Sequence, residues 1–249
     1  GYKYAEQALT INKRDVELTS ASASKVYDGT ALTKDWVDMG PNRADTGFIW
    51  TDLAGDGQVH ATGSQTVVGK SDNTISYQLK AGAADNYNIL PNKLGTLEVT
   101  AQSIVPDPEN PDSYKGITIS DPSDHVYDGK AHKWAPTVRD AEGNELVEDT
   151  DYTVSYDTDD FTNVTGIITV TITGIGNYTG KATRTYQITP KGYSVVTGNA
   201  SKVYDGTPLL GTDAKVTPAN KVDGLVNAAD ATFAVTGTLT EVGSTDNTY

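Results

Sequence analysis

The heptapeptide "SKVYDGT" stands at residues 24–30 and returns unchanged at 201–207, and a related one, "DHVYDGK", stands at 124–130. Lys, Val and Tyr suit a strand, whereas Asp-Gly suits a tight turn, because Gly adopts positive φ without steric cost and Asp accepts a hydrogen bond from the backbone two residues on. We therefore expect a strand and turn to open each of three folding units. Each tyrosine ring is predicted to lie on the core, with its hydroxyl bonded to a neighbouring backbone group. The motif residues are Tyr27, Asp28, Gly29, Tyr127, Asp128, Gly129, Tyr204, Asp205 and Gly206.

The segments that follow the heptapeptide define two repeat types. "ATGSQTVVGKSDNT" at 61–74 and "VTGTLTEVGSTDNT" at 235–248 follow their heptapeptides at nearly the same distance, so the first and third units are one type. The middle unit continues differently, as "DYTVSYDTDDFTNVTGIITVTITGIGNYTGKATRTYQITP" at 151–190. A recurring opening in two repeat types favours a structural role for the motif over a ligand-binding one.

Alternation of apolar and polar residues predicts strands almost throughout. It is clearest at Leu97 and Val99, at Ile75, Tyr77 and Leu79, at Tyr152, Val154 and Tyr156, and at Ile168, Val170 and Ile172. Short strands broken by Gly, Asn and Asp clusters predict a sandwich or a barrel. Together with the repeats, we expect an all-β chain of tandem small immunoglobulin-like β-sandwich domains in an elongated array. The alternative is β-grasp-like modules, which would require residues 31–39, the only stretch compatible with one helical turn, to be helical.

One strand carries a charge on its apolar face. Arg184 shares the face of Ala182, Tyr186 and Ile188. An edge position, with the guanidinium reaching water, would explain this arrangement.

Composition shifts predict the boundaries. The stretch "VPDPENPDSYKG" at 105–116 reads as a stiff, self-repelling Pro/acidic linker. We predict a YDG-type repeat at 15–104, a linker at 105–113, a bacterial Ig-like repeat at 114–190 and a second YDG-type repeat at 191–249.

The two ends of the chain look complementary. Residues 1–14, "GYKYAEQALTINKR", resemble the end of the first repeat, with Leu9 and Ile11 in the places of Leu97 and Val99, so they read as the last strand of a preceding repeat. The unit at 191–249 lacks a counterpart of residues 78–100. We expect its open edge to accept residues 1–14, from a neighbouring molecule, by strand exchange.

The motifs as a whole resemble known repeat families. "SKVYDGT…TGSQTVVGKSDNTISYQL…NYNI…GTLEVT" is similar to the YDG/MBG-type tandem repeats of large surface proteins of Gram-positive gut bacteria, and the middle unit looks like the bacterial Ig-like repeats of the same proteins. The resemblance implies extracellular display at the cell surface, in proteins usually called adhesins, with cell-wall attachment outside this chain. It carries over no catalytic residue, and the family name alludes to mucin.

Composition narrows the classes of function. The 249 residues include no Cys, which excludes disulfides, Cys-based zinc sites and thiol nucleophiles. The formal charge of −14 opposes nucleic-acid binding, and no apolar run is long enough for a membrane span. No phosphate loop or nucleophile elbow is present, so we expect no enzyme and no cofactor.

Candidate binding residues are few. Trp36, Trp50 and Trp134 could stack on sugars. His60, His125 and His132 are expected to be exposed loop residues without a metal. The acids at 145–160, including "DTDD" at 157–160, lack calcium-loop spacing, although an ion at Asp107, Glu109 and Asp112 stays open. A Lys–Asn isopeptide crosslink also stays open.

The expected function is therefore mechanical. The chain reads as a non-catalytic repeat region of a bacterial cell-surface protein, acting as a stalk, a spacer or part of an adhesin and contacting neighbouring repeats. The alternative is direct binding of a host glycan or mucin by one of the domains.

Overall fold

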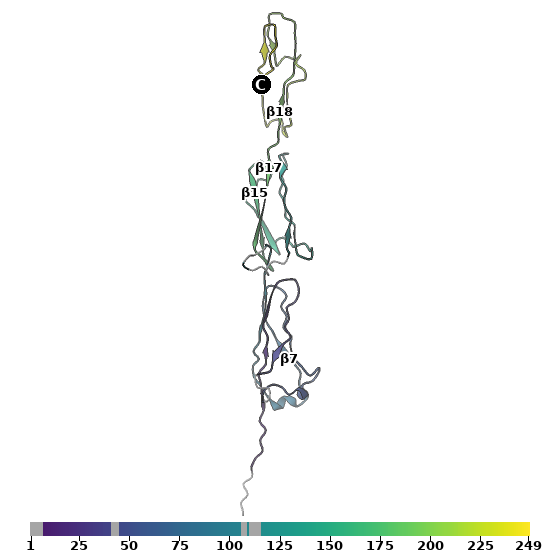
Figure 1. Ribbon diagram of the computed structural model, residues 1–249, viewed down its shortest axis with the longest axis vertical. Coiled ribbons are helices and arrows are strands. Elements are labelled where there is room, and N and C mark those ends of the chain that lie inside the picture. The colour runs from purple at the N-terminus through teal and green to yellow at the C-terminus, as the bar shows by residue number, and fades with distance from the viewer. Residues whose placement is uncertain (1–6, 41–44, 106–108, 110–115) are drawn as a thin grey trace, which may run out of the picture. The chain divides into compact units, whose positions relative to one another are not determined.

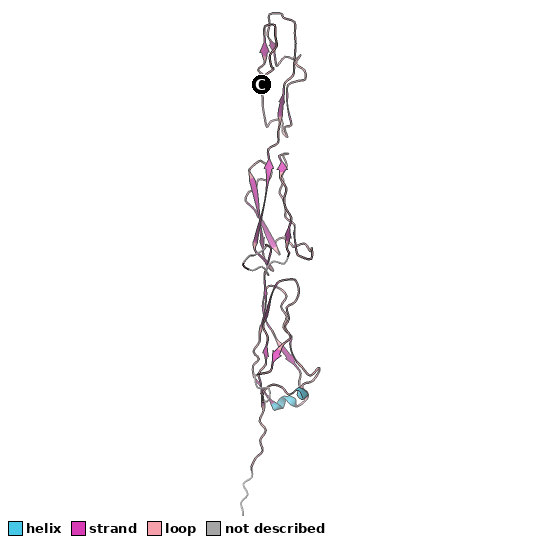
Figure 2. Cartoon of the chain, viewed as in Figure 1, coloured by secondary structure: helices cyan, strands magenta, loops and turns pink. Residues whose placement is uncertain are grey.

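The computed structural model describes residues 7–40, 45–105, 109 and 116–249 (Figure 1). Their secondary structure is nearly all β, with short strands between long loops and two short 3-10 helices (Figure 2). Residues 1–6 and most of the predicted linker at 105–113 lie outside the described residues. The predicted repeat boundaries stay a prediction.

The chain divides into two compact units, each made of three separate segments of the sequence. The first comprises Gly1–Ile119, Val138–Val154 and Ile172–Ala182, and the second comprises Ser120–Thr137, Ser155–Thr171 and Thr183–Tyr249. Elements of the first unit are β1 (Arg14–Val16), β2 (Thr19–Ser20), β3 (Ala23–Val26), β4 (Val37–Asp38), η1 (Trp50–Asp52), β5 (Val59–Ala61), β6 (Gly69–Asp72), β7 (Ile75–Tyr77), η2 (Ala83–Asn86), β8 (Tyr87–Ile89), β9 (Thr96–Thr100), β10 (Gln102–Ser103), β11 (Thr118–Ile119), β13 (Val138–Arg139) and β16 (Tyr178–Thr179).

The second unit contains the remaining short strands. These are β12 (His125–Val126), β18 (Ser194–Val196), β19 (Leu209–Leu210), β20 (Lys221–Asp223) and β21 (Thr238–Leu239). Three longer strands run through residues of both units: β14 (Tyr152–Tyr156), β15 (Ile167–Gly174) and β17 (Lys181–Thr189).

Two sheets contain the strands with which the first and second heptapeptides begin. In the three-stranded sheet the order is β3-β9-β6, with β9 parallel to β3 and antiparallel to β6. In the four-stranded sheet the order is β12-β17-β15-β14, with β12 parallel to β17. In both cases the strand before a YDG turn therefore pairs in parallel with the last long strand of its region.

The apolar faces predicted from alternation are buried in β9 and β15, and half-buried at Ile75, Tyr77 and Leu79 and at Val154 and Tyr156. Leu97 and Val99 of β9, and Ile168, Val170 and Ile172 of β15, are almost completely removed from water. In the first unit a separate core cluster gathers loop and strand residues, with half-buried Val37, Val59, Ile75, Tyr77 and Leu79 packed against it; its members are Val16, Leu18, Met39, Phe48, Leu53 and Tyr87. Period-two alternation thus identified one face of each of these strands correctly.

Two local predictions were wrong. Residues 31–39 contain no helical turn; they form an irregular segment that ends in β4, so the condition for the β-grasp alternative is not met. Strand β17 is an inner strand of its sheet, not an edge. Arg184 is tolerated there because β12 pairs only with Ile188 and Thr189, and its Nε donates to Asp121 Oδ1 at 2.6 Å.

Candidate functional site

The first and third YDG turns have the same geometry. In the first, Asp28 Oδ1 accepts the backbone N–H of Thr30 at 3.0 Å and the Lys25 ammonium at 2.6 Å, and Gly29 has φ +75°. In the third, Asp205 Oδ1 accepts from Thr207 N at 3.0 Å and from Lys202 at 2.8 Å. The lysine ammonium holds the pKa of each aspartate well below its usual range. Each carboxylate is occupied within its own turn, which confirms the turn prediction.

The motif tyrosines do not lie in the core. Tyr27 and Tyr127 are half-buried and Tyr204 is exposed. The ring of Tyr27 packs edge-on against Tyr178 with centroids 5.7 Å apart. The prediction of a core tyrosine was wrong here because the following turn places the motif near the end of its strand.

Other tyrosines take the predicted core role. Tyr87 is buried against Phe48, and its hydroxyl donates to Asp52 and accepts the N–H of Ile49. Tyr186 is buried, and its hydroxyl donates to the carbonyl of His132. The apolar alternation at 182–188 identified Tyr186, whereas Tyr87 stood out only as part of the NYNI motif, to which no core role was assigned.

The middle turn replaces the lysine by histidines. Asp128 accepts the backbone N–H of Lys130 at 2.9 Å and pairs with His132 Nε2 at 2.8 Å. The rings of His125 and His132 stack with centroids 4.2 Å apart. Both histidines are half-buried, so the expectation of fully exposed loop residues was wrong for this pair. Because their rings stack and His132 pairs with Asp128, both histidines contribute to the structure of the turn.

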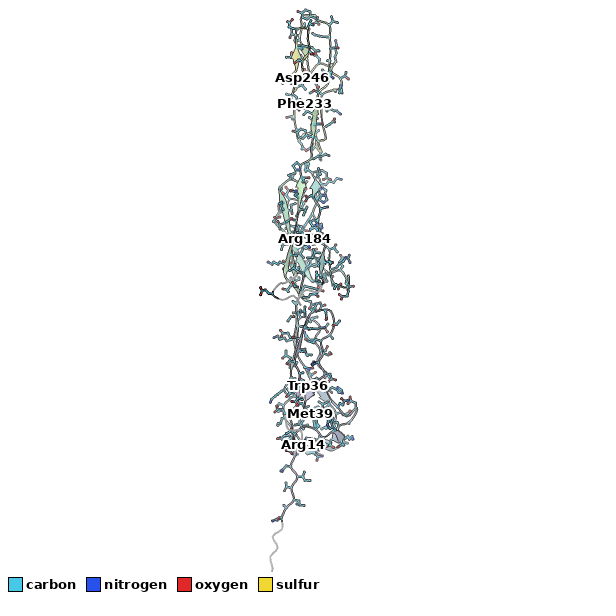
Figure 3. All side chains as sticks on the ribbon, viewed as in Figure 1. Arg14, Trp36, Met39, Arg184, Phe233 and Asp246 are labelled. Atoms are coloured by element: carbon cyan, nitrogen blue, oxygen red, sulfur yellow. The ribbon has the colours of Figure 1, made fainter. Side chains whose placement is uncertain are left out.

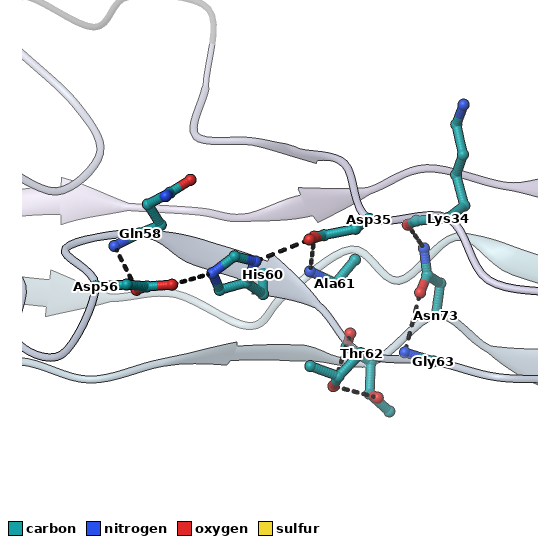
Figure 4. A network of polar contacts seen from close by, with 10 residues as sticks. Lys34, Asp35, Asp56, Gln58, His60, Ala61, Thr62, Gly63 and Asn73 are labelled. Carbon is teal, nitrogen blue, oxygen red and sulfur yellow. Dashed lines mark hydrogen bonds and ion pairs between the residues drawn. The ribbon is translucent and has the colours of Figure 1, made fainter.

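An Asp–His–Asp group connects two segments of the first unit (Figure 4). His60 Nδ1 lies 2.8 Å from Asp35 Oδ2, and its Nε2 lies 2.6 Å from Asp56 Oδ2. The hydrogen bond to Asp35, followed by that to Asp56, raises the pKa of His60, and the same contacts lower the pKa of both aspartates.

This group is poorly suited to catalysis. Both ring nitrogens of His60 face a carboxylate, so neither is free to take a proton from a substrate. The other oxygens of Asp35 and Asp56 accept the N–H groups of Ala61 and Gln58. The His60 ring therefore fastens the loop at Asp56 to the segment at Asp35, which is a structural task.

Asn73 links three segments of the same region (Figure 4). Its side chain is fully buried, its amide donates to the carbonyls of Ala21 and Lys34, and its Oδ1 accepts the N–H of Gly63. Its backbone N–H donates to Gly95, just before β9. A buried amide with these partners fixes the loops around β9.

The three tryptophans occupy different environments. Trp36 and Trp50 are 53% and 54% exposed (Figure 3 labels Trp36). Trp134 is half-buried, and its backbone is held by the hydroxyls of Tyr186 and Tyr156. In the part of the chain that the structure describes, none of the three stacks on another aromatic ring.

The acidic stretch of the middle repeat is occupied by local hydrogen bonds. Asp157 accepts the N–H of Thr169. Asp160 accepts hydrogen bonds from the side-chain amide and the backbone N–H of Asn163 and from the N–H of Thr162, which lower the pKa of Asp160. Within the described ranges, no group of three or more His, Cys, Asp and Glu side chains could hold a metal ion. The inter-repeat ion stays untested, because Asp107 and Asp112 lie outside those ranges.

Early and late strands pair in parallel in both regions. β1 lies parallel to β8 with Arg14 opposite Tyr87, and β10 lies parallel to β16 with Gln102 opposite Tyr178. Two more early strands also pair in parallel with late ones, β3 with β9 and β12 with β17. The backbone N–H of Tyr27 donates to Thr100, and that of Tyr127 donates to Thr189. The motif thus extends each parallel ladder to the start of its turn.

Comparison with family models, curated proteins and solved structures finds no match to this chain. No helix among the described residues has the length and apolar character needed to cross a membrane.

Proposed function

We propose that the chain is a non-catalytic repeat region of a bacterial cell-surface protein that transmits tension as a stalk or spacer, or as part of an adhesin. Tandem immunoglobulin-like β-sandwich modules are the finer fold that this proposal includes. The observation that supports it is the parallel pairing of early with late strands in both described repeat regions.

The direction of pairing decides how a module resists force. When a chain is pulled from its two ends, tension acts on an early strand from its N-terminal side and on a late strand from its C-terminal side. In a parallel pair these forces slide the strands along each other, so the hydrogen bonds of the ladder are loaded together. In an antiparallel pair pulled at adjacent ends, the bonds break one after another.

The chain also leads tension from one ladder directly into the next. β9 ends at Thr100 and β10 begins at Gln102. β9 is held by β3 and β6, and β10 by β16. A pull that reaches β9 therefore passes through a single intervening residue to the next parallel pair.

Force spectroscopy on the 249-residue chain tests this role. Pulled from its ends, the chain should rupture in cooperative steps at high force. The control is the same chain pulled through cysteines introduced at exposed Lys70 and half-buried Glu98, which face each other across β6 and β9. This attachment unzips the antiparallel pair, so we expect clearly lower rupture forces. Equal forces in both directions would contradict the proposal.

A second candidate function rests on the exposed indole rings of Trp36 and Trp50. Exposed aromatic faces are suited to stacking on sugars, and the alternative proposal is direct binding of a host glycan or mucin. A glycan array probed with the chain and with Trp36→Ala and Trp50→Ala tests it. A signal lost in either variant supports binding, and an array without signal supports the spacer role.

A further inference from the structure

Residues 198–249 reproduce the frame that surrounds β9 in the first repeat. Asn247 donates to the carbonyl of Gly198 at 2.9 Å, as Asn73 donates to that of Ala21. The N–H of Thr236 donates to Thr248, as that of Thr62 donates to Thr74. By sequence, residues 200–203 correspond to β3 and residues 243–246 to β6.

Between these two segments lies a cavity rather than a strand. It has a volume of about 460 Å³, and its lining includes Ala200, Ser201, Lys202, Ser244, Thr245 and Asp246 (Figure 3 labels Asp246). In the first repeat the corresponding segments are joined by β9, in the register Ser24↔Glu98 and Lys70↔Glu98. The cavity therefore has the position of a strand that would be parallel to one wall and antiparallel to the other.

Two further observations distinguish these walls from their counterparts in the first repeat. Val203 is 88% exposed, whereas its counterpart Val26 is half-buried beside β9. Within the described residues, Asn247 Oδ1 is buried without a hydrogen-bond partner, whereas Asn73 Oδ1 accepts the N–H of Gly63. A buried amide oxygen without a partner is costly, so this frame is less completely hydrogen-bonded than the frame of the first repeat.

The chain carries a segment of matching pattern. Leu9-Thr10-Ile11 corresponds to Leu97-Glu98-Val99, and Leu9 precedes β1 by the same number of residues as Leu97 precedes β10. Leu9 and Ile11 are fully exposed, and residues 7–13 belong to no strand. These residues have the alternation of a β9-type strand but none of its burial.

Charge favours their association. Residues 1–14 contain three basic residues and one acidic residue, whereas residues 198–249 contain three basic and six acidic residues. Opposite net charges on the two partners increase the rate of encounter and favour binding.

We propose that residues 7–13 of a second copy of this chain enter the cavity at 198–249 as an added strand. This strand lies parallel to residues 200–203 and antiparallel to residues 243–246, with Leu9 and Ile11 turned inward. The contact is heterologous, so it joins copies head to tail. This association depends only on the cavity and the added strand, and not on the proposed cell-surface role.

Sedimentation velocity over a concentration series tests association. The chain should form species that grow with concentration, and Leu9→Asp should remove them. Thr10→Glu is the matched control, because its counterpart Glu98 is tolerated on the outer face, and it should associate like the parent. Because residues 9 and 10 are exposed, neither variant threatens the fold. A chain that stays monomeric at every concentration overturns the proposal.

Cysteine trapping tests the register in a chain that has no Cys of its own. A chain with Thr10→Cys and a second chain with Ser201→Cys should form a mixed disulfide, whereas Thr10→Cys with Asp223→Cys should not. Leu9→Asp added to the first chain should reduce the yield on the order of tenfold. Equal yields for both pairs overturn the register. A disulfide that closes within one chain carrying both cysteines, independent of concentration, overturns the second-copy assignment.

Discussion

The first and third repeats share their opening heptapeptide, yet only the first is well packed. Leu97 and Val99 of β9 are buried between segments that also appear, in sequence, at 200–203 and 243–246. No large apolar residue of 194–249 is buried, and the segment at 201–204 forms no strand. The comparison teaches that the YDG turn forms from local contacts, whereas the strand beside it needs a partner supplied by a distant segment.

The largest expected effect is at β9, the strand between β3 and β6. Leu97→Ala should destabilise the first repeat by about 2–5 kcal/mol, because it removes a fully buried side chain from between β3 and β6. Leu239→Ala is the matched change in the third repeat, where the side chain is half-buried. Its opening free energy, measured by hydrogen exchange, should fall much less. Similar losses at both sites would remove the distinction.

The buried amide gives a smaller contrast. Asn73→Ala should cost about 1–3 kcal/mol, because it leaves the carbonyls of Ala21 and Lys34 and the N–H of Gly63 without their partner. Asn247→Ala should cost less, since its Oδ1 has no partner to lose among the described residues. Peptide-resolved hydrogen exchange measures both. A larger effect for Asn247 would show that the third repeat is closed in solution.

Exchange of the unmodified chain sharpens the same comparison without mutation. The amides of 69–72, which pair with β9, should exchange on the order of tenfold or more slowly than those of 243–246. At concentrations where copies join head to tail, the protection of 243–246 should rise. Constant fast exchange at all concentrations would argue against the added strand.

The smallest effect concerns a group that only the first repeat has. The pKa of His60 is raised above 6.5 by its two aspartates, so their bridge is fully formed below that pH and is lost as pH rises through the folded-state pKa. An NMR titration should show a midpoint above 6.5, and Asp35→Asn should lower it. His60 is exposed, so the stability change should be slight. A midpoint at the free-histidine value would contradict the bridge.

Local periodicity predicted much of the fold. The alternation at 96–100, 152–156 and 167–174 identified β9, β14 and β15, because burial on one face of a strand leaves a period of two. Local turn chemistry also gave the Asp-Gly turns. The His60 bridge and the Asn73 contacts could not be predicted, because their partners are distant in sequence and polar residues without a pattern carry no sign of pairing.

By itself, the sequence determined the all-β class, the repeated turns and the apolar faces, since each depends on residues a few positions apart. Only the tertiary structure decided which strands are neighbours and in which direction they run. It placed Tyr87 in the core and Tyr27 at its margin, and it made β17 an inner strand despite Arg184. These outcomes depend on contacts between segments far apart in the chain. Such contacts produce no periodic pattern of residues in either segment alone.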